Sequence, residues 1–194
     1  LGGYYTGING WEFSVEGYYK DMRNVLEYKD GVSFFGSSSG WENKVEMGKG
    51  RSAGIEFMAQ KTAGKTTGWL SYTLSKSDRK FTKGGINNGE WFPYKYGRRH
   101  SINLTINHKF SDRIDIGASW VFYTGGTSTI PEEKTTVIRP HNGANNGFLW
   151  YGTYDNTNSS PTIGDVSYIE HRNNFRLPAS HRLNLGVNFN KKTK

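Results

Sequence analysis

The amino-acid sequence predicts an all-β protein, and more specifically a segment of an antiparallel transmembrane β-barrel. Three observations support this prediction: stretches of about ten residues that alternate apolar and polar side chains, connections that alternate between short and long, and a composition poor in residues for an internal core. Successive side chains of a strand point to opposite faces, so the alternation gives one apolar and one polar face. A strand tilted by about 45° crosses a bilayer in roughly nine to eleven residues, which matches these stretches.

The composition argues against a soluble core. Only 34% of the 194 residues are hydrophobic, while 15% are aromatic and 25 are glycine, and the mean hydropathy is −0.73. A soluble domain of this size normally contains more Val, Ile and Leu, whereas a membrane barrel has a polar lumen and an outward apolar band. No run reaches the eighteen or so apolar residues of a membrane helix, and the first residues carry neither an initiator Met nor a signal peptide, so we expect an interior fragment.

Three strands are expected in the first half of the chain, near residues 11–20, 51–61 and 67–76. The first follows Asn9-Gly10, a pair that accepts the positive φ of hairpin turns. Residues 1–5 would be the end of an earlier strand. The second and third strands are joined by a short turn that contains Gly64.

Three more strands are expected near 100–110, 114–123 and 181–190. A tight turn at residues 111–113 joins the first two of them. The fifth strand has one apolar exception, Val121, among its polar positions. The last strand has the plainest alternation of the chain.

The alternation divides the strand residues between two faces of the expected wall. The lipid-facing residues are expected to be Phe13, Val15, Ile55, Phe57, Ile102, Leu104, Ile106, Ile116, Trp120, Leu183, Leu185 and Val187. The lumen-facing residues are expected to be Glu12, Glu16, Glu56, Asn103, Asn107, Arg182 and Asn184.

The connections between these strands alternate in length. Long loops are expected near 21–50, 77–99 and 124–178, and short turns elsewhere. Three such long loops would be unusual in a compact soluble domain, but barrels of the outer membrane have long extracellular loops and short periplasmic turns. The long loops are therefore expected outside the cell, and the short turns in the periplasm.

Aromatic residues fall near both ends of the strands, as expected for rings at the two membrane interfaces. Trp11, Trp69 and Phe110 lie beside the short turns, and Tyr19, Phe122 and Tyr123 lie near the long loops. The alternative is that such rings fill the core of a soluble or secreted β-sandwich that binds a ligand. Six strands cannot close a water-filled barrel, and open edges are not tolerated in lipid, so the barrel interpretation requires further strands.

Four segments resemble the TonB-dependent receptors of the outer membrane, in particular the C-terminal part of the barrel in the Bacteroidetes type. They are Gly-Arg-Ser-Ala-Gly-Ile-Glu at 50–56, Tyr-Gly-Arg-Arg-His-Ser at 96–101, Tyr-Thr-Gly-Gly at 123–126, and Arg-Asn-Asn-Phe-Arg-Leu-Pro-Ala-Ser-His-Arg-Leu at 172–183. The last is similar to an Arg-x-Pro-x-x-His-Arg-Leu-Asp signature, with Asn184 in place of Asp.

The resemblance implies a 22-stranded barrel with an N-terminal plug, of which about six strands are present in this chain. It implies active import of a siderophore, corrinoid, oligosaccharide or peptide, with energy from TonB, which would bind the N-terminal part. Outer-membrane lipid and a possible surface lipoprotein are the other expected partners. Because rings stack on sugars and heterocycles, the candidate ligand contacts in the loops are Trp91, Phe92, Tyr94, Trp150, Tyr151 and Tyr154.

Other chemistries find little support in the sequence. The net charge of +8 is dispersed, and no nucleic-acid-binding motif accompanies it. The five histidines show no zinc-ligand spacing, and there is no cysteine. Ser37, Ser38 and Ser39 lie between Gly36 and Gly40 in a Gly/Ser-rich loop, without the strand-to-helix turn of a nucleophile elbow. Glu12 and Glu16 would be about 13 Å apart, too far for a glycosidase pair. We therefore expect no catalytic residue, no metal site, no cofactor and no nucleic-acid partner.

Overall fold

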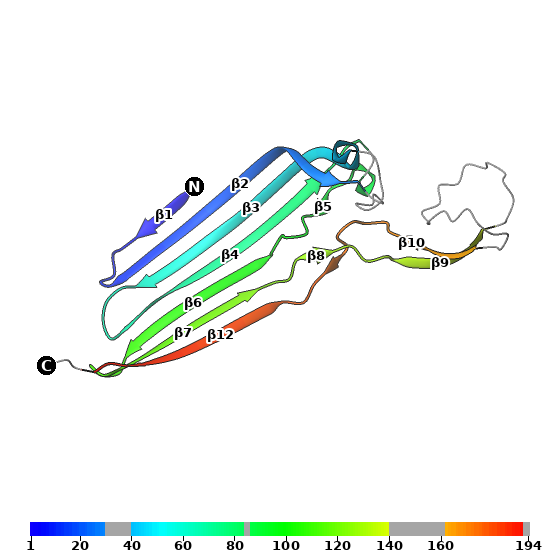
Figure 1. Cartoon of the computed structure of the whole chain (residues 1–194). Coiled ribbons are helices and arrows are strands. Elements are labelled where there is room, and N and C mark those ends of the chain that lie inside the picture. Colours follow the sequence, from blue (N-terminus) through cyan, green and yellow to red (C-terminus); the bar gives the residue numbers. More distant parts are fainter. Residues whose placement is uncertain (30–39, 84–85, 140–161, 192–194) are drawn as a thin grey trace.

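The computed structural model describes residues 1–29, 40–83, 86–139 and 162–191. It is an antiparallel all-β structure built on one large sheet with the strand order β1-β2-β3-β4-β6-β7-β12 (Figure 1). The short strand β5 pairs with the C-terminal end of β4. The sheet does not close on itself, so β1 and β12 form its two edges. Within the described part of the chain, no helix has the length and hydropathy needed to span a membrane.

The strands of the large sheet are β1 (Gly2–Tyr5), β2 (Trp11–Tyr28), β3 (Val45–Lys61), β4 (Thr66–Lys80), β5 (Phe92–Pro93), β6 (His100–Lys109), β7 (Ile114–Tyr123) and β12 (Ser180–Phe189). Two smaller pairs join β8 (Thr127–Ser128) with β11 (Phe175–Arg176), and β9 (Glu133–Arg139) with β10 (Thr162–Tyr168). Two single 3-10 turns, η1 (Trp41–Lys44) and η2 (Asn87–Gly89), complete the described elements.

Three short turns lie together at one end of the sheet (Figure 1). Gly10 has φ 75° where β1 turns into β2, and Gly64 has φ 92° between β3 and β4. At both positions the backbone is in a region that glycine enters without steric cost. Between β6 and β7 the backbone N–H of Phe110 donates to the carbonyl of Ile114 at 3.0 Å. We call this the turn end of the sheet, and the opposite end the loop end.

At the loop end, the strands continue beyond the ranges expected from the sequence. β2 continues to Tyr28 rather than ending near residue 20, β3 begins at Val45, and β4 continues to Lys80. Backbone pairing does not require an apolar face, so the ladder persists after the alternation has stopped. The described part of the expected loop 124–178 likewise contains β8 to β11.

A β-bulge at Asn24 explains why the alternation of β2 cannot be followed through residues 20–28. Arg23 pairs with Lys49, but Val25 pairs with Gly48, so Asn24 is left without a partner and has φ 58°. An extra residue in one strand reverses the face on which all later side chains lie. Val25 and Glu27 are therefore on the face opposite to the one that uninterrupted alternation would give.

The register places the two residue sets of the sequence analysis on opposite faces. Directly paired residues share a face, and the ladders pair Glu16 with Glu56, Ser71 with Asn103, and Ser119 with Asn184. Followed from strand to strand, they collect Glu12, Glu16, Glu56, Asn103, Asn107, Arg182 and Asn184 on what we call the polar face. The other side, the apolar face, carries Phe13, Val15, Ile55, Phe57, Ile102, Leu104, Ile106, Ile116, Trp120, Leu183, Leu185 and Val187.

Two of the six aromatic residues that were expected at the membrane interfaces are not on the apolar face. Trp69 pairs with Gln60 and Thr105, and Tyr123 pairs with Ser101, all on the polar face. The expectation that all six rings line the membrane interfaces is therefore wrong for Trp69 and Tyr123. Both residues do lie near a strand end. Their positions in the alternation of β4 and β7, however, put their side chains on the polar face.

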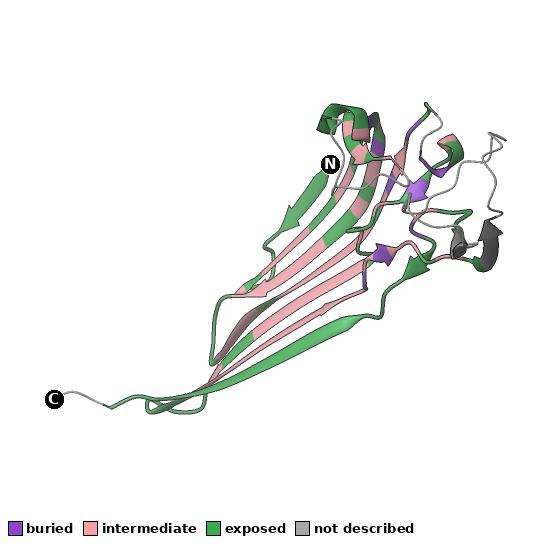
Figure 2. Cartoon of the chain, turned by 45° about the vertical axis from the view of Figure 1, so that its right-hand side comes forward, coloured by how far each residue is buried: buried purple, intermediate pink, exposed green. Residues whose placement is uncertain are grey.

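The buried core is small and lies at the loop end. Phe81, Ile86 and Phe92 are the buried apolar residues of the described chain, and Val25 packs against them. Most strand residues are only half buried, while β1 and β12 are exposed along their length (Figure 2). On the apolar face, Leu185 is 73% exposed and Ile55 is 55% exposed. No described segment covers this face in the way that a second sheet covers a sandwich.

Candidate functional site

A polar cavity lies at the loop end of the sheet. It has a volume of about 280 Å³ and is lined by Glu27, Lys95, Thr127, Ser128, Thr129, Arg172 and Asn173. These residues come from the end of β2, the segment after β5, β8, and the segment before β11. Four parts of the chain that are distant in sequence therefore meet there.

Glu27 lies between two arginines. Its carboxylate is 3.7 Å from Nη1 of Arg79 and 3.6 Å from Nη2 of Arg172. All three side chains are less than one fifth exposed. The Asn24 bulge creates this cluster, because it puts Glu27 on the polar face, where Arg79 also lies. Removal of the bulge would turn the carboxylate away from both guanidinium groups.

The cluster has an excess of positive charge. Arg79 and Arg172 share the single carboxylate of Glu27, and Lys95 adds a third cation beside the cavity. Within the described residues, the ammonium group of Lys95 has no carboxylate within ion-pair distance; it lies 4.8 Å from the ring centre of Tyr96. Glu46, which is 5% exposed, is the direct partner of Glu27 on the same face, so the region holds three cations and two carboxylates, a net charge of +1. This excess favours an anionic group.

Arg79 is further held by an aromatic ring. Its guanidinium lies 3.8 Å from the ring centre of Tyr94, a distance typical of cation–π contacts. Its Nη1 donates to the carbonyl of Leu26 at 3.4 Å, whereas its Nε is buried without a hydrogen-bond partner. The ring of Tyr94 therefore packs against one side of the cluster.

Hydrogen bonds to the backbone connect the segments around the cavity. Asn173, which has φ 56°, donates from Nδ2 to the carbonyl of Pro93 at 2.7 Å, and its backbone N–H donates to Oγ1 of Thr129 at 3.0 Å. The hydroxyl of Thr127 donates to the carbonyl of Tyr94 at 3.3 Å. Arg176 donates to the carbonyl of Gly125 at 2.8 Å. These bonds therefore fix the 172–176 segment to β5 at Pro93 and to residues 125–129.

The structure separates the three described aromatic candidates. Trp91 lies on the apolar-face side, where the guanidinium of Arg51 is 4.3 Å from its ring centre, and it is 38% exposed. Tyr94 is beside Arg79 in the cationic cluster. Phe92 is only 3% exposed and packs on Phe81 with the ring centres 6.0 Å apart.

Phe92 is therefore a packing residue in this structure, and contact of its ring with a ligand stays a prediction. Alternation puts Trp91 on the face opposite to Phe92 and Tyr94, because Phe92 pairs with Arg79. Phe92 and Tyr94 share that face and differ in their packing, Phe92 on Phe81 and Tyr94 on Arg79. Trp150, Tyr151 and Tyr154 lie outside the described residues.

The polar strand residues form a wall that leads away from the cavity. Asn103 donates to Oγ of Ser71 at 3.3 Å, and Nε of Arg182 donates to Oδ1 of Asn184 at 3.0 Å. Glu16 and Glu56 face each other directly across β2 and β3. None of the seven polar-face residues lines the cavity.

The cavity residues were missed by sequence reasoning for identifiable reasons. Glu27 is hidden by the bulge, and Lys95 and residues 127–129 lack any pattern. Arg172 and Asn173 had a usable signal, since they begin the last of the four family-like segments. Arg172 brings that segment to the end of β2, and Asn173 binds it to Pro93 and Thr129.

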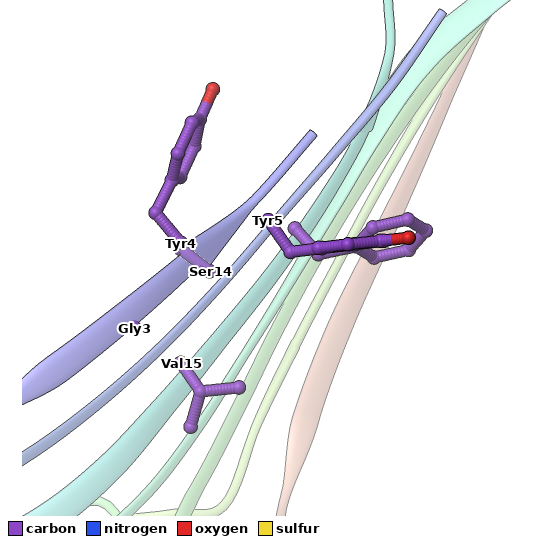
Figure 3. A pocket seen from close by; sticks show the side chains of 6 residues that line it. Gly3, Tyr4, Tyr5, Ser14 and Val15 are labelled. Carbon is purple, nitrogen blue, oxygen red and sulfur yellow. The ribbon is translucent and has the colours of Figure 1, made fainter. Parts of the chain in front are cut away.

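A second hollow lies at the edge of the sheet, over β1 and β2 (Figure 3). It forms where Gly3 lacks a side chain between neighbouring Tyr5 and Val15, while Tyr4 points away from them. Gly3 pairs with Val15 on the apolar face. The surface of this hollow is almost wholly apolar, so it offers little polar area for specific binding. In the described residues, no three side chains of His, Cys, Asp or Glu are grouped to hold a metal ion.

Comparison with known proteins gives one match. A family model described as TonB dependent receptor-like, beta-barrel, matches residues 1–194. No curated protein and no solved structure matches the chain.

Proposed function

Because the chain belongs to the TonB-dependent receptor β-barrel family, we propose that it forms part of the barrel of an outer-membrane receptor that imports a nutrient with energy from TonB. Receptors of this kind carry ligands that are too large for porins. The candidate ligands are a siderophore, a corrinoid, an oligosaccharide or a peptide. A Bacteroidetes-type receptor with a surface lipoprotein is part of the same proposal.

The separation of two faces along the sheet is the observation that supports this function best. The polar face suits a water-filled lumen in contact with a plug, and the uncovered apolar face suits lipid. A wall of this kind needs further strands at both edges, where β1 and β12 have unpaired backbone groups.

The cavity at the loop end is the proposed contact for ligand. Its lining includes Glu27 of the polar face, and the excess of positive charge around it favours a ligand that carries a carboxylate or phosphate group. Lys95 would provide a point charge, while Arg172 is held in place by Glu27. Tyr94 and the loop aromatics would pack beside the bound group.

Uptake by cells tests this proposal. Cells lacking the receptor are complemented with the complete receptor, either wild type or Lys95→Gln, and accumulation of labelled candidate ligands is compared with and without a protonophore. We expect accumulation that requires the proton-motive force and that falls about tenfold in the variant at subsaturating ligand, since one charge-assisted contact contributes roughly 1.5–3 kcal/mol. Lys20→Gln is the matched control, because Lys20 is an exposed lysine on the polar face far from the cavity.

Two results would overturn the proposal. Accumulation that continues with the protonophore would contradict energy from TonB. A receptor that stays monomeric and folded in buffer without detergent would instead support the soluble ligand-binding sandwich.

A further inference from the structure

Two neighbouring rows of charged residues cross the apolar face near its loop end. The first row consists of Asp21, Arg51 and Asp78, which are direct partners across β2, β3 and β4. The second row lies one pleat further out and consists of Arg23, Lys49 and Lys80, again direct partners. The first row alternates in sign, and the second contains three cations.

The first row is electrostatically satisfied. Nε and Nη2 of Arg51 both lie 3.1 Å from Oδ2 of Asp78, and Nζ of Lys76 is 3.5 Å from the same oxygen. The carboxylate of Asp78 is only 7% exposed. The carboxylate of Asp78 is the one buried carboxylate of these two rows, and its charge is already balanced by Arg51 and Lys76.

The second row has fewer counter-charges than cations. Arg23 has one exposed contact, at 3.7 Å, with Asp21. Among the described residues, neither Lys49 nor Lys80 has an ion pair or a hydrogen bond from its side chain. Like charges that face each other directly across strands are destabilising. The fold therefore places three cations side by side, and in the described chain the exposed contact of Arg23 with Asp21 is the one ion pair that offsets their charge.

The position of this row indicates the chemistry that would neutralise it. On β3, the residues of the apolar face run from Phe57 and Ile55 to Arg51 and then Lys49. On β2 the same face runs from Val15 to Tyr19 before the charged rows begin. From Trp11 to Asp21, the first charged residue of this face on β2, a strand tilted by about 35–45° spans roughly 23–27 Å of membrane depth, about the height of the apolar band of a membrane barrel. The cations begin where lipid headgroups begin.

We propose that Arg23, Lys49 and Lys80 form a binding site for the phosphate groups of lipids in the outer leaflet. The inference rests on the proposed function for its membrane setting. With Arg51, Lys76, Asp21 and Asp78, the surface has five cations and two carboxylates, a net charge of +3. Lysine ammonium groups bind phosphate as point charges, and two facing lysines hold one phosphate between them. A bound lipid would thereby stabilise the loop ends of β2, β3 and β4.

The test compares the complete receptor in neutral detergent with and without lipid A that carries two phosphates, and measures bound lipid by native mass spectrometry. The wild type is expected to retain lipid A, and Lys49→Gln/Lys80→Gln to bind it about tenfold more weakly. Lys20→Gln, on the opposite face, is the control and is expected to match the wild type. Raising the salt concentration should weaken the wild type toward the double variant.

A stability measurement distinguishes loss of lipid binding from loss of folding. The double substitution removes repulsion, so in neutral detergent the variant should be at least as thermally stable as the wild type. With lipid A added, the wild type should gain more stability than the variant. Equal gains would overturn the proposal.

Two further arms identify the source of the phosphate. Lipid A without its phosphates is expected to bind weakly to both proteins, and equal binding of the two lipids would overturn the proposal. Inorganic phosphate at the same concentration should not reproduce the gain in stability; if it does, the site binds free anions and the lipid assignment is wrong. A receptor that transports its ligand but fails these tests contradicts only this inference.

Discussion

Arg51 and Asp78 form a two-pronged ion pair across β3 and β4, in which Nε and Nη2 of the arginine both lie 3.1 Å from Oδ2 of the aspartate. The ring of Trp91 covers the guanidinium, with its centre 4.3 Å away. The pair marks the level at which the apolar face gives way to charged residues. It also fixes β4 where β5 joins it.

Asp78→Asn is expected to destabilise the receptor by about 1–3 kcal/mol, because it leaves Arg51 beside a buried side chain that no longer carries a charge. Thermal unfolding of the complete receptor in detergent measures the change. Asp21→Asn is the matched control from the same row; its carboxylate is 55% exposed, so the expected change is within about 0.5 kcal/mol. Equal effects of the two substitutions would contradict the role given to burial.

The bulge at Asn24 can be tested by paired cysteines, since the chain contains no cysteine of its own. Leu26 and Met47 are direct partners in the shifted register. A disulfide between cysteines at 26 and 47 is therefore expected to form readily, because cross-strand partners meet its distance requirement. Cysteines at 25 and 47 would pair only without the bulge. Faster cross-linking of the 25/47 pair would refute the shifted register.

Glycine substitutions test the close pairing of β4 with β6. A Cβ atom at Gly68 would collide with the carbonyl oxygen of Thr105 and would lie 3.0 Å from the Cα atom of Ile106. Gly68→Ala should therefore cost about 2 kcal/mol or more, measured by unfolding of the receptor in detergent. At Gly186 a Cβ atom meets nothing within 4 Å. Gly186→Ala should be neutral or slightly stabilising, and a loss as large as at Gly68 would disprove the steric explanation.

Glu27→Gln tests the cationic cluster. The substitution keeps the shape of the side chain but leaves Arg79 and Arg172 without their shared carboxylate. We expect a loss of about 1–2 kcal/mol, since the groups are mostly but not fully buried. Protease digestion should then cut the 172–176 segment sooner than in the wild type. Glu56→Gln, on the wall and exposed, should leave the digestion rate unchanged.

The part of the sheet near its turn end was predictable because its information is local. Alternation in β6 and β12 assigns each residue to a face, and the Asn9-Gly10 pair predicts the turn before β2. The registers then place Glu16 beside Glu56 and Leu104 beside Trp120.

The loop end was not predictable in the same way. One unpaired residue, Asn24, reverses the faces of Val25 and Glu27, and its effect cannot be seen without the partner strand. Arg172 meets Glu27 from the other end of the sequence, a contact that no periodicity encodes. The burial of Phe92 was not predictable, because an aromatic residue in a polar loop can either be exposed or form a small core, and only packing decides between the two.

The central claim is that the two faces of this sheet meet different solvents, and nitroxide accessibility at two adjacent positions of β3 tests it most directly. Single cysteines replace Ile55 on the apolar face and Glu56 on the polar face of the complete receptor in bilayers, and each label is exposed to oxygen and to a water-soluble nickel complex. The account predicts that oxygen dominates at 55 and the nickel complex at 56. Access of the nickel complex to 55 equal to that at 56, or shielding of 55 from both reagents, would contradict it.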